Sequence, residues 1–154
     1  PRLRRYARAL TGDAARADDL VQDTVERALV KRALWRPGSD LRAWLFTVMH
    51  NLFVNQMRAS RPPDTPLDEA PDMPVSGGQM DALATRDVHA ALMRLPETQR
   101  EVMLLVGLEQ FGYAEAAHVL GVPVGTVMSR LARAREQLRR DLAGEPAVPL
   151  KVVK

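Results

Sequence analysis

The residues with the clearest chemical meaning lie in the last third of the chain, in the segment YAEAAHVLGVPVGTVMSRL at positions 113–131. The pattern predicts a short helix, a tight turn and a second helix, because Gly121 can adopt the left-handed conformation that ends a helix. The residues expected to fill the angle between the two helices are small or apolar: Ala116, Ala117, Leu120, Val122, Val127 and Leu131. The segment therefore predicts a helix-turn-helix.

The outer face of the second of these helices carries side chains suited to nucleic acid. Its members are Gly125, Thr126, Ser129, Arg130 and Arg133. They lie toward the N-terminal half, which is the part that a helix-turn-helix inserts into the major groove. Ser and Arg at such positions can bond base edges and phosphates. A helical hairpin with a solvated Arg face is the alternative, but the coincidence of small, glycine and apolar positions favours DNA binding.

An acidic segment near the start, DDLVQDTVER, has three possible interpretations. Asp19, Asp23 and Glu26 share one helical face, which is compatible with a metal site, with a solvated surface, or with a docking face for a basic partner. In the docking interpretation, Leu20 and Val21 are the apolar anchors. The metal interpretation lacks the Glu-x-x-His pattern of helical di-metal proteins.

A third segment combines aromatic and basic residues between Trp35 and Asn51. Trp35 and Trp44 lie near a Pro-Gly loop, and bases of single-stranded nucleic acid stack on such rings while Arg follows the phosphates. Several polar side chains here can hold a flipped-out base by its edges: Ser39, Asp40, Asn51 and Asn55. The alternative is that the two Trp belong to the core of a small bundle, and for Trp44 alone this alternative is favoured.

Helices must position all three segments, since apolar residues recur at helical spacing and no segment has the period of a strand. Leu3, Tyr6, Ala7 and Leu10 form the first stripe, which Gly12 ends. A second helix carries its stripe from Leu20 to Leu29, and a third begins at Ser39 or Asp40 and continues past Phe53. In the second half, helices are expected at about 81–94, from Pro96, at 113–120 and at 124–142.

A Pro-rich, acidic segment at residues 59–80 separates these helices into two sets. Its composition predicts a mobile linker, because it cannot bury enough apolar surface to offset its ordering. We expect an all-α protein of two small helical bundles, at 1–58 and 81–142, with a C-terminal tail at 143–154. The 22 linker residues reach about 68 Å in a polyproline-like form or about 26 Å as a flexible coil.

Composition narrows the classes of function. The chain of 154 residues has a net charge of +3, no Cys, and 19 Arg against 3 Lys, and its Arg residues gather near the two ends. Arg suits phosphate and base recognition, so the partner is expected to be an anionic polymer. The sequence shows no catalytic triad, no Gly-rich phosphate loop and no apolar run of about 20 residues for a membrane span. It predicts a cytoplasmic protein that is not an enzyme and needs no cofactor, metal ion or small-molecule substrate.

Taken together, the three segments resemble the extracytoplasmic-function (ECF, group IV) sigma factors of bacterial RNA polymerase. The family's order is present: DDLVQDTVERAL, then GSDLRAWLFTVMHNL, a variable linker, and LPETQREVMLLVGLEQFGYAEAAHVLGVPVGTVMSRLARAREQL. The resemblance implies core RNA polymerase and promoter DNA as partners. It also implies control by an anti-sigma factor, which in this family is commonly membrane-anchored.

The resemblance also assigns roles to residues. Those implied to dock on core polymerase are Asp18, Asp19, Leu20, Val21, Gln22, Asp23 and Arg27. Those implied to open and capture the minus-ten element are Ser39, Asp40, Arg42, Trp44, Asn51, Asn55 and Arg58. Those implied to read the minus-thirty-five element as duplex are Gly125, Thr126, Ser129, Arg130 and Arg133. The sequence departs from the family at Met49-His50 and in the loop at Ser39–Leu41, which leaves the preferred minus-ten sequence open.

Other functions remain possible at this point. A stand-alone helix-turn-helix regulator would explain residues 95–142, but it would leave the Trp-rich segment and the acidic face without a role. A small metal-dependent hydrolase using the acidic face would need His partners. An adaptor that binds only protein would leave the Arg face at 130–140 unexplained.

Overall fold

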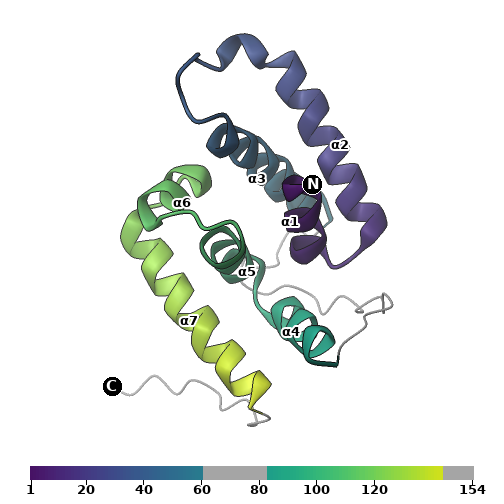
Figure 1. Cartoon of the computed structure of the whole chain (residues 1–154), viewed down its shortest axis with the longest axis vertical. Helices are drawn as coiled ribbons and strands as arrows, with labels where there is room; N and C mark the ends of the chain where they lie inside the picture. Colours follow the sequence, from purple (N-terminus) through teal and green to yellow (C-terminus); the bar gives the residue numbers. More distant parts are fainter. Residues whose placement is uncertain (61–82, 144–154) are drawn as a thin grey trace.

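The computed structural model describes residues 1–60 and 83–143, and every regular element in these ranges is a helix (Figure 1). The prediction of an all-α fold is thus confirmed for the described residues. In chain order the elements are α1 (Arg2–Thr11), α2 (Ala14–Val30), the 3₁₀ turn η1 (Arg32–Leu34), α3 (Leu41–Ser60), α4 (Leu83–Arg94), α5 (Glu97–Met103), the π-helical turn η2 (Leu104–Leu108), α6 (Tyr113–Leu120) and α7 (Val124–Leu142).

Local sequence signals set most helix ends. Gly12 ends α1 with a φ of 73°, a left-handed conformation in which a side chain would be strained. The side chain of Asp13 then caps α2 by accepting hydrogen bonds from the backbone N–H groups of Ala15 and Arg16. Asp40 caps α3 in the same way, accepting from the backbone N–H of Arg42 at 3.0 Å. Of the two residues predicted to cap the third helix, Asp40 is the one that does so.

Two helix ends differ from those that the sequence predicts. Pro96 was expected as the first residue of a helix, but it is the N-cap residue and α5 begins at Glu97. At the other end, α3 continues to Ser60, two residues into the segment predicted to be a linker. The rest of that segment lies within residues 61–82, which are outside the described residues, as is the tail from residue 144.

The helices fall into two groups, which we call the first helix group (α1–α3) and the second helix group (α4–α7). In the first group α2 packs against both α1 and α3, and Leu10, Leu20 and Met49 are fully buried. In the second group α7 packs against α4, α5 and α6, around Leu105 and Leu131. Within each group the helices therefore bury apolar residues that recur at helical spacing against their neighbours.

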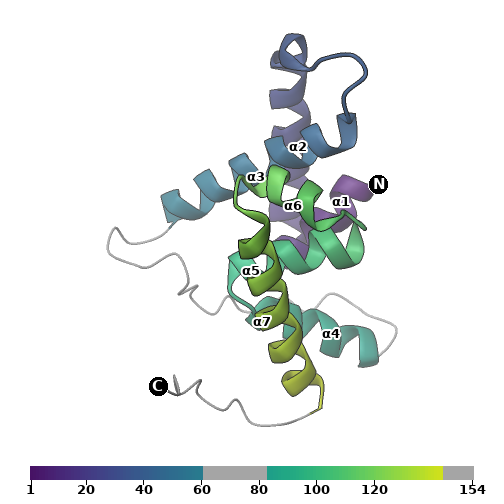
Figure 2. The same ribbon diagram turned by 90° about the vertical axis from the view of Figure 1, so that its left-hand side faces the viewer.

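The two groups also pack on each other, and their buried side chains form one continuous core. Helix α3 lies against α6, and α1 lies against α4, α5 and η2 (Figures 1 and 2). Tyr6, Phe46 and Phe111 form an edge-to-face aromatic chain across this boundary, with ring centroids 5.0 and 5.3 Å apart. The sequence predicts two bundles on a tether; it gives no indication that they share a core.

No helix within residues 1–60 and 83–143 combines the length and the apolar character needed to cross a membrane.

Candidate nucleic-acid interface

The helix-turn-helix is formed by α6, a three-residue turn and α7. Gly121 ends α6 with a φ of 66°, and the N–H of Val122 donates to the carbonyl of Ala117 at 3.1 Å. This is the hydrogen-bonding pattern of a glycine C-cap, and it fixes the direction in which α7 leaves the turn. Five of the side chains predicted to fill the angle between the helices are buried: Ala116, Ala117, Leu120, Val127 and Leu131. The sixth, Val122, is half-buried.

The outer face of α7 presents its predicted side chains to solvent. Gly125, Ser129 and Arg133 are exposed, whereas Thr126 and Arg130 are half-buried. A Cβ added at Gly125 would meet open space, so the backbone itself is accessible here. The Ser129 hydroxyl donates to the Thr126 carbonyl at 3.1 Å. This leaves its oxygen free to accept another hydrogen bond.

The C-terminal half of α7 is electrostatically different. Glu136 accepts hydrogen bonds from Arg139 and Arg140 at 3.0–3.1 Å, and the bond from Arg139 lowers the pKa of the Glu136 carboxyl. Part of the basic charge at this end is therefore neutralised within the helix itself. Arg130 and Arg133, nearer the turn, lie on the half that a helix-turn-helix presents to the major groove.

The second predicted DNA face lies on α3. Asn51, Asn55 and Arg58 are exposed and recur at helical spacing, so they form one face of this helix. Ser39 and Asp40 are exposed at its start, where the Ser39 hydroxyl donates to the Arg36 carbonyl. The structure thus gathers five of the seven residues predicted for the minus-ten element on the exposed surface of α3 and the loop before it.

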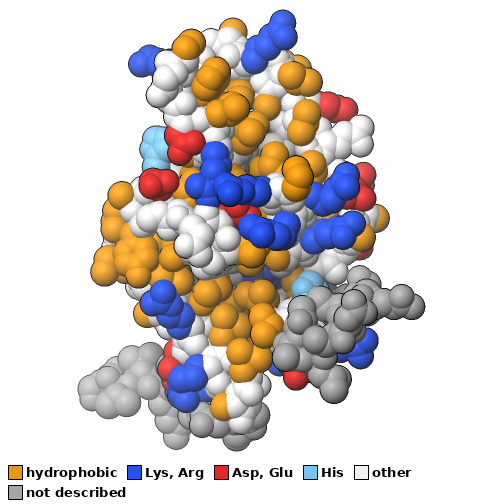
Figure 3. All heavy atoms as spheres, viewed as in Figure 1, with side chains coloured by type: hydrophobic (Ala, Val, Ile, Leu, Met, Phe, Trp, Pro, Cys, Tyr) orange, Lys and Arg blue, Asp and Glu red, His pale blue; other side chains and the backbone are white. Residues whose placement is uncertain are grey.

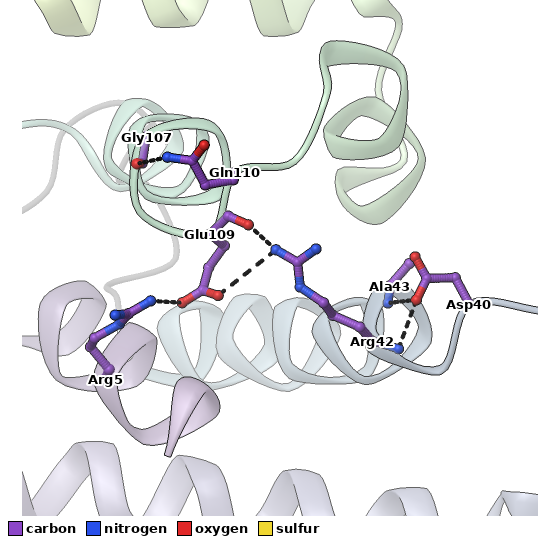
Figure 4. A network of polar contacts seen from close by, with 7 residues as sticks. All are labelled: Arg5, Asp40, Arg42, Ala43, Gly107, Glu109 and Gln110. Atoms are coloured by element: carbon purple, nitrogen blue, oxygen red, sulfur yellow. Dashed lines mark hydrogen bonds and ion pairs between the residues drawn. The ribbon is translucent and has the colours of Figure 1, made fainter.

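Arg42 and Trp44, the other two, are half-buried. Arg42 points toward the second helix group, where its guanidinium donates a hydrogen bond to the Glu109 carbonyl and lies 4.1 Å from the centroid of the Phe111 ring. Figure 4 shows this side chain between Asp40, which precedes its helix, and Glu109 opposite. In this arrangement Arg42 contacts protein at the place where nucleic acid was expected.

The acidic face predicted for docking lies on α2. Asp18, Asp19 and Asp23 are exposed, and Asp18 forms an ion pair with Arg4 at 3.4 Å. The expectation that Leu20 is an apolar anchor on this face is wrong, because its side chain is completely buried in the core. A helix turns about 100° per residue, so Leu20 lies beside the face that Asp19 and Asp23 share, on the side that packs into the core. Val21, the other expected anchor, is half-buried.

An apolar surface continues from this face toward the loop before α3. It consists of exposed side chains on α2, η1 and the start of α3: Val25, Leu29, Val30, Leu34 and Leu41. In Figure 3 hydrophobic side chains gather at this upper end of the molecule, and Lys and Arg side chains cross the middle of the same face. Clustered exposed apolar residues of this kind mark a surface that binds a partner. The sequence predicted a stripe through Val25 and Leu29 but did not show that its second half is exposed.

Within the described part of the chain, no three His, Asp or Glu side chains come together in a group that could hold a metal ion.

Sequence reasoning missed the charged residues that join the two groups. Arg100 is buried and donates four hydrogen bonds to backbone carbonyls, those of Leu10, Leu92, Met93 and Leu95. One of these, from Nη1 to Leu10 at 2.9 Å, crosses from the second group to α1. Burial lowers the pKa of Arg100, although nearby Glu97 and Glu101 oppose this effect.

A pair formed by the half-buried His50 and the buried Glu101 is a second contact between the two helix groups. His50 Nδ1 lies 2.5 Å from Oε2 of Glu101, which is almost completely buried. Burial raises the pKa of the Glu101 carboxyl, and the hydrogen bond from His50 partly offsets the increase. The sequence contained one signal: Glu101 and Glu109 flank the apolar run VMLLVGL, and a charge buried in such a run needs a partner. It could not identify that partner.

Comparison with protein families finds matches for both helix groups. Residues 1–50 match the model described as the Sigma2 domain of PhyR, and residues 85–138 match Sigma-70, region 4. Among curated proteins, the chain is 44% identical over 140 residues to the ECF RNA polymerase sigma factor EcfG of Rhodopseudomonas palustris, covering 90% of this chain and 77% of that protein. It is 33% identical to the ECF RNA polymerase sigma factor SigM of Mycobacterium tuberculosis, covering 91% and 71%.

Solved structures give the same relationship. The sigma factor RpoE of Bartonella quintana, in complex with the anti-sigma factor NepR, matches with a TM-score of 0.72 and 35% identity, covering 94% of this chain and 91% of that one. CnrH, in complex with the cytosolic domain of CnrY, matches with a TM-score of 0.68 and 28% identity, covering 94% and 82%.

Proposed function

Because the chain belongs to the ECF sigma factors of RNA polymerase, we propose that its two helix groups divide promoter recognition between them. A sigma factor binds core RNA polymerase and directs it to promoters, and it contributes no catalytic group of its own. In this proposal α7 reads the minus-thirty-five element as duplex, α3 captures the opened minus-ten strand, and α2 docks on core polymerase.

The observation that carries the proposal is the exposed N-terminal half of α7, with Ser129 and Arg133 presented by a preformed helix-turn-helix. The turn fixes the orientation of α7, so these side chains reach base edges without a folding step on binding. A phosphate contact by Arg130, on the same half of α7, sets the register on the duplex, while the exposed side chains distinguish the bases.

The proposed capture of the minus-ten strand depends on the exposed polar face of α3. Asn51 and Asn55 offer amide donors and acceptors to a base edge, and Arg58 offers a charge to a phosphate. Each base that stacks on an aromatic side chain gains about 1–3 kcal/mol. This offsets part of the mean cost of about 1.4 kcal/mol for unstacking each step of the DNA duplex.

Docking on core polymerase is assigned to the outer face of α2 and the apolar surface beside it. Asp19 and Asp23 supply negative charge for a basic partner, and Leu29 and Leu34, which are 60% and 71% exposed, supply apolar area. Burial of such side chains at an interface is worth about 1.5–3 kcal/mol each if it is complete. Leu29 and Leu34 therefore replace Leu20 as the proposed apolar contacts.

The experiment that tests this function is run-off transcription with purified core polymerase on genomic fragments, with and without the protein. We expect discrete transcripts that require both components. Arg133→Ala should lower the affinity for a duplex of the upstream element and leave association with core unchanged. Arg135→Ala is the matched control, because this exposed Arg lies two residues further along α7, about 200° around the helix.

Docking is tested separately by gel filtration with core polymerase. Asp19→Arg should abolish comigration, whereas Asp87→Arg, at an exposed position on α4, should not. If the wild-type protein neither comigrates with core nor yields transcripts, the proposed division of roles is wrong.

We extend the proposal to control by an anti-sigma factor, since the related RpoE was crystallised in complex with one. Adding NepR to the transcription assay should reduce the transcripts, and unchanged transcripts would contradict this extension.

One observation favours a second function. Residues 1–50 match the Sigma2 domain of PhyR, and PhyR is itself described as an anti-anti-sigma factor that binds NepR. A chain with this role would bind the anti-sigma factor and fail to bind core polymerase. The gel filtration experiment distinguishes the two functions directly.

A further inference from the structure

Glu109 lies at the centre of a contact between the two helix groups. This contact has no role in the promoter recognition proposed above. Its carboxylate is 1% exposed, and it forms ion pairs with Arg5 of α1 at 3.5 Å and with Arg42 of α3 at 3.9 Å. Figure 4 shows both guanidinium groups directed at this one side chain, which follows η2 in the second group. A buried carboxylate is stable only when it is paired, and here both partners come from the other helix group.

Arg42 receives three kinds of interaction from the second group. The Glu109 carboxylate supplies negative charge, the Glu109 carbonyl accepts a hydrogen bond, and the Phe111 ring lies under the guanidinium. A single-stranded nucleotide offers the same three features, namely a phosphate charge, oxygen acceptors and an aromatic base face. Glu109 and Phe111 thus occupy Arg42 in the way that a nucleotide would.

The contact belongs to an arrangement in which the two helix groups are packed together. Helices α3 and α6 pack directly against each other. Sites one to two turns apart on duplex DNA are separated by about 34–72 Å. If α3 and α7 read two such elements, the helix groups must separate, and Arg42 must then leave Glu109.

We propose that Glu109 and Phe111 together act as an internal mimic of a nucleotide. In the free protein they bind Arg42 and hold the two helix groups together, and the opened promoter strand displaces them from Arg42. The inference rests on the proposed function, because it takes Arg42 as a contact to the minus-ten strand. The His50–Glu101 pair and the Arg100–Leu10 hydrogen bond belong to the same closed interface. The Glu109 contact differs from these two because it engages Arg42, a residue that is expected to bind DNA.

Separation of the helix groups can be measured directly, because the chain contains no Cys. Spin labels on Ala15→Cys in α2 and Ala132→Cys in α7, both at exposed positions, report the distance between the groups by double electron–electron resonance. We expect one short distance in the otherwise wild-type protein. Glu109→Gln should raise the ratio of open to closed molecules about tenfold, which corresponds to about 1.4 kcal/mol.

Glu115→Gln is the matched control. It removes the same charge from the second helix group, at an exposed position on α6 that is not part of the contact. Phe111→Ala tests the aromatic half of the mimic. Because Phe111 is buried in the shared core, its fold is checked by circular dichroism. If that variant unfolds, Glu109→Gln alone decides the result.

The competition itself is tested with a fluorescent 12-nucleotide single strand that carries the minus-ten sequence from the transcription assay. Without polymerase, Glu109→Gln should bind this strand about tenfold more tightly than wild type, a change of about 1.4 kcal/mol. The additional change Arg42→Ala should remove the gain.

An unchanged distance distribution in Glu109→Gln overturns the proposal, because the groups are then held by other contacts. If Glu109→Gln lengthens the distance between the spin labels but leaves the affinity for the single strand unchanged, Glu109 does not compete with a nucleotide for Arg42. These results are distinct from failure of the proposed function, which is the absence of transcripts with core polymerase. The distance measurement requires neither polymerase nor DNA.

Discussion

The two helices proposed to meet promoter DNA present their side chains in opposite ways. Helix α7 carries Ser129 and Arg133 on an open surface, and its orientation is set by the turn at Gly121. Helix α3 has an equally exposed polar face at Asn51 and Asn55, but Arg42 near its start is covered by the second helix group. The surface proposed to read duplex DNA is therefore preformed, whereas the proposed capture of the opened strand depends on the relative position of the groups.

This difference has a physical origin. The helix-turn-helix depends on local signals, which are a glycine cap and a small apolar interior, so its turn is set within the second helix group. The state of Arg42 depends on residues 67 and 69 positions away in sequence. These contacts depend on whether the two helix groups are packed together, and they do not depend on whether α3 is folded.

The largest expected effect is the loss of the buried Arg that links α5 to its own helix group and to α1. Arg100→Ala removes four hydrogen bonds to buried or half-buried carbonyls, including the one to Leu10 in the other group. We expect a loss of about 3 kcal/mol in the free energy of unfolding, measured by urea denaturation. The surface variant Arg135→Ala should change it by less than about 0.5 kcal/mol. Equal effects in the two variants would show that the buried Arg does not hold the interface.

A change in the turn tests whether α7 is preformed. Gly121→Ala places a side chain at a φ of 66° with no atom within 4 Å, so strain alone should cost about 1–2 kcal/mol. The affinity for a duplex of the upstream element should decrease as well, because α7 leaves the turn at a different angle. Thermal unfolding and fluorescence anisotropy measure the two effects.

Gly125→Ala is the paired experiment on the same helix. This glycine is helical and faces open space, so Ala should stabilise the fold by about 0.5–1 kcal/mol. The added methyl group should still weaken duplex binding, because the backbone at this position is proposed to approach DNA. If both Gly variants lose stability, the conformational difference between the two positions is not the cause.

The start of α3 can be weakened without altering a DNA-facing ring or cation. Asp40→Ala removes the side chain that caps the helix at the backbone N–H of Arg42, and we expect a loss of about 1 kcal/mol in a urea titration. Asp40→Asn keeps the acceptor and should lose much less. Similar losses in the two variants would mean that the negative charge, and not the cap, is important.

The smallest expected effect is a change in how the free energy of unfolding depends on pH, and it arises at the His50–Glu101 pair. Burial raises the pKa of the Glu101 carboxyl above its ordinary value of 4.5. The folded protein therefore holds the proton of this carboxyl more tightly than the unfolded chain does. The contribution of Glu101 to stability is therefore fully present below pH 4.5 and is lost as the pH rises through the raised pKa. Glu101→Gln should remove this decrease in urea unfolding measured between pH 4 and pH 7. An identical pH dependence in the variant and the wild type would contradict this assignment.

The amino-acid sequence by itself determined the helices and the helix-turn-helix. Gly12, Asp40 and Gly121 act within one turn of their own position, and the stripe from Tyr6 to Leu10 needs only helical periodicity to be recognised. The exposed face of α7 can also be predicted from the sequence, because the apolar side of a helix is buried and the opposite side must then face solvent. These features depend on interactions between residues a few positions apart.

Only the tertiary structure decided which charges are buried and what they contact. It placed Glu109 between Arg5 and Arg42, joined His50 to Glu101, and turned Leu20 away from the docking face into the core. The sequence shows that a carboxylate in an apolar run needs a partner, but the partner comes from a helix more than 50 residues away. Its identity depends on how the two helix groups pack, because burial makes each of these charges require a particular neighbour.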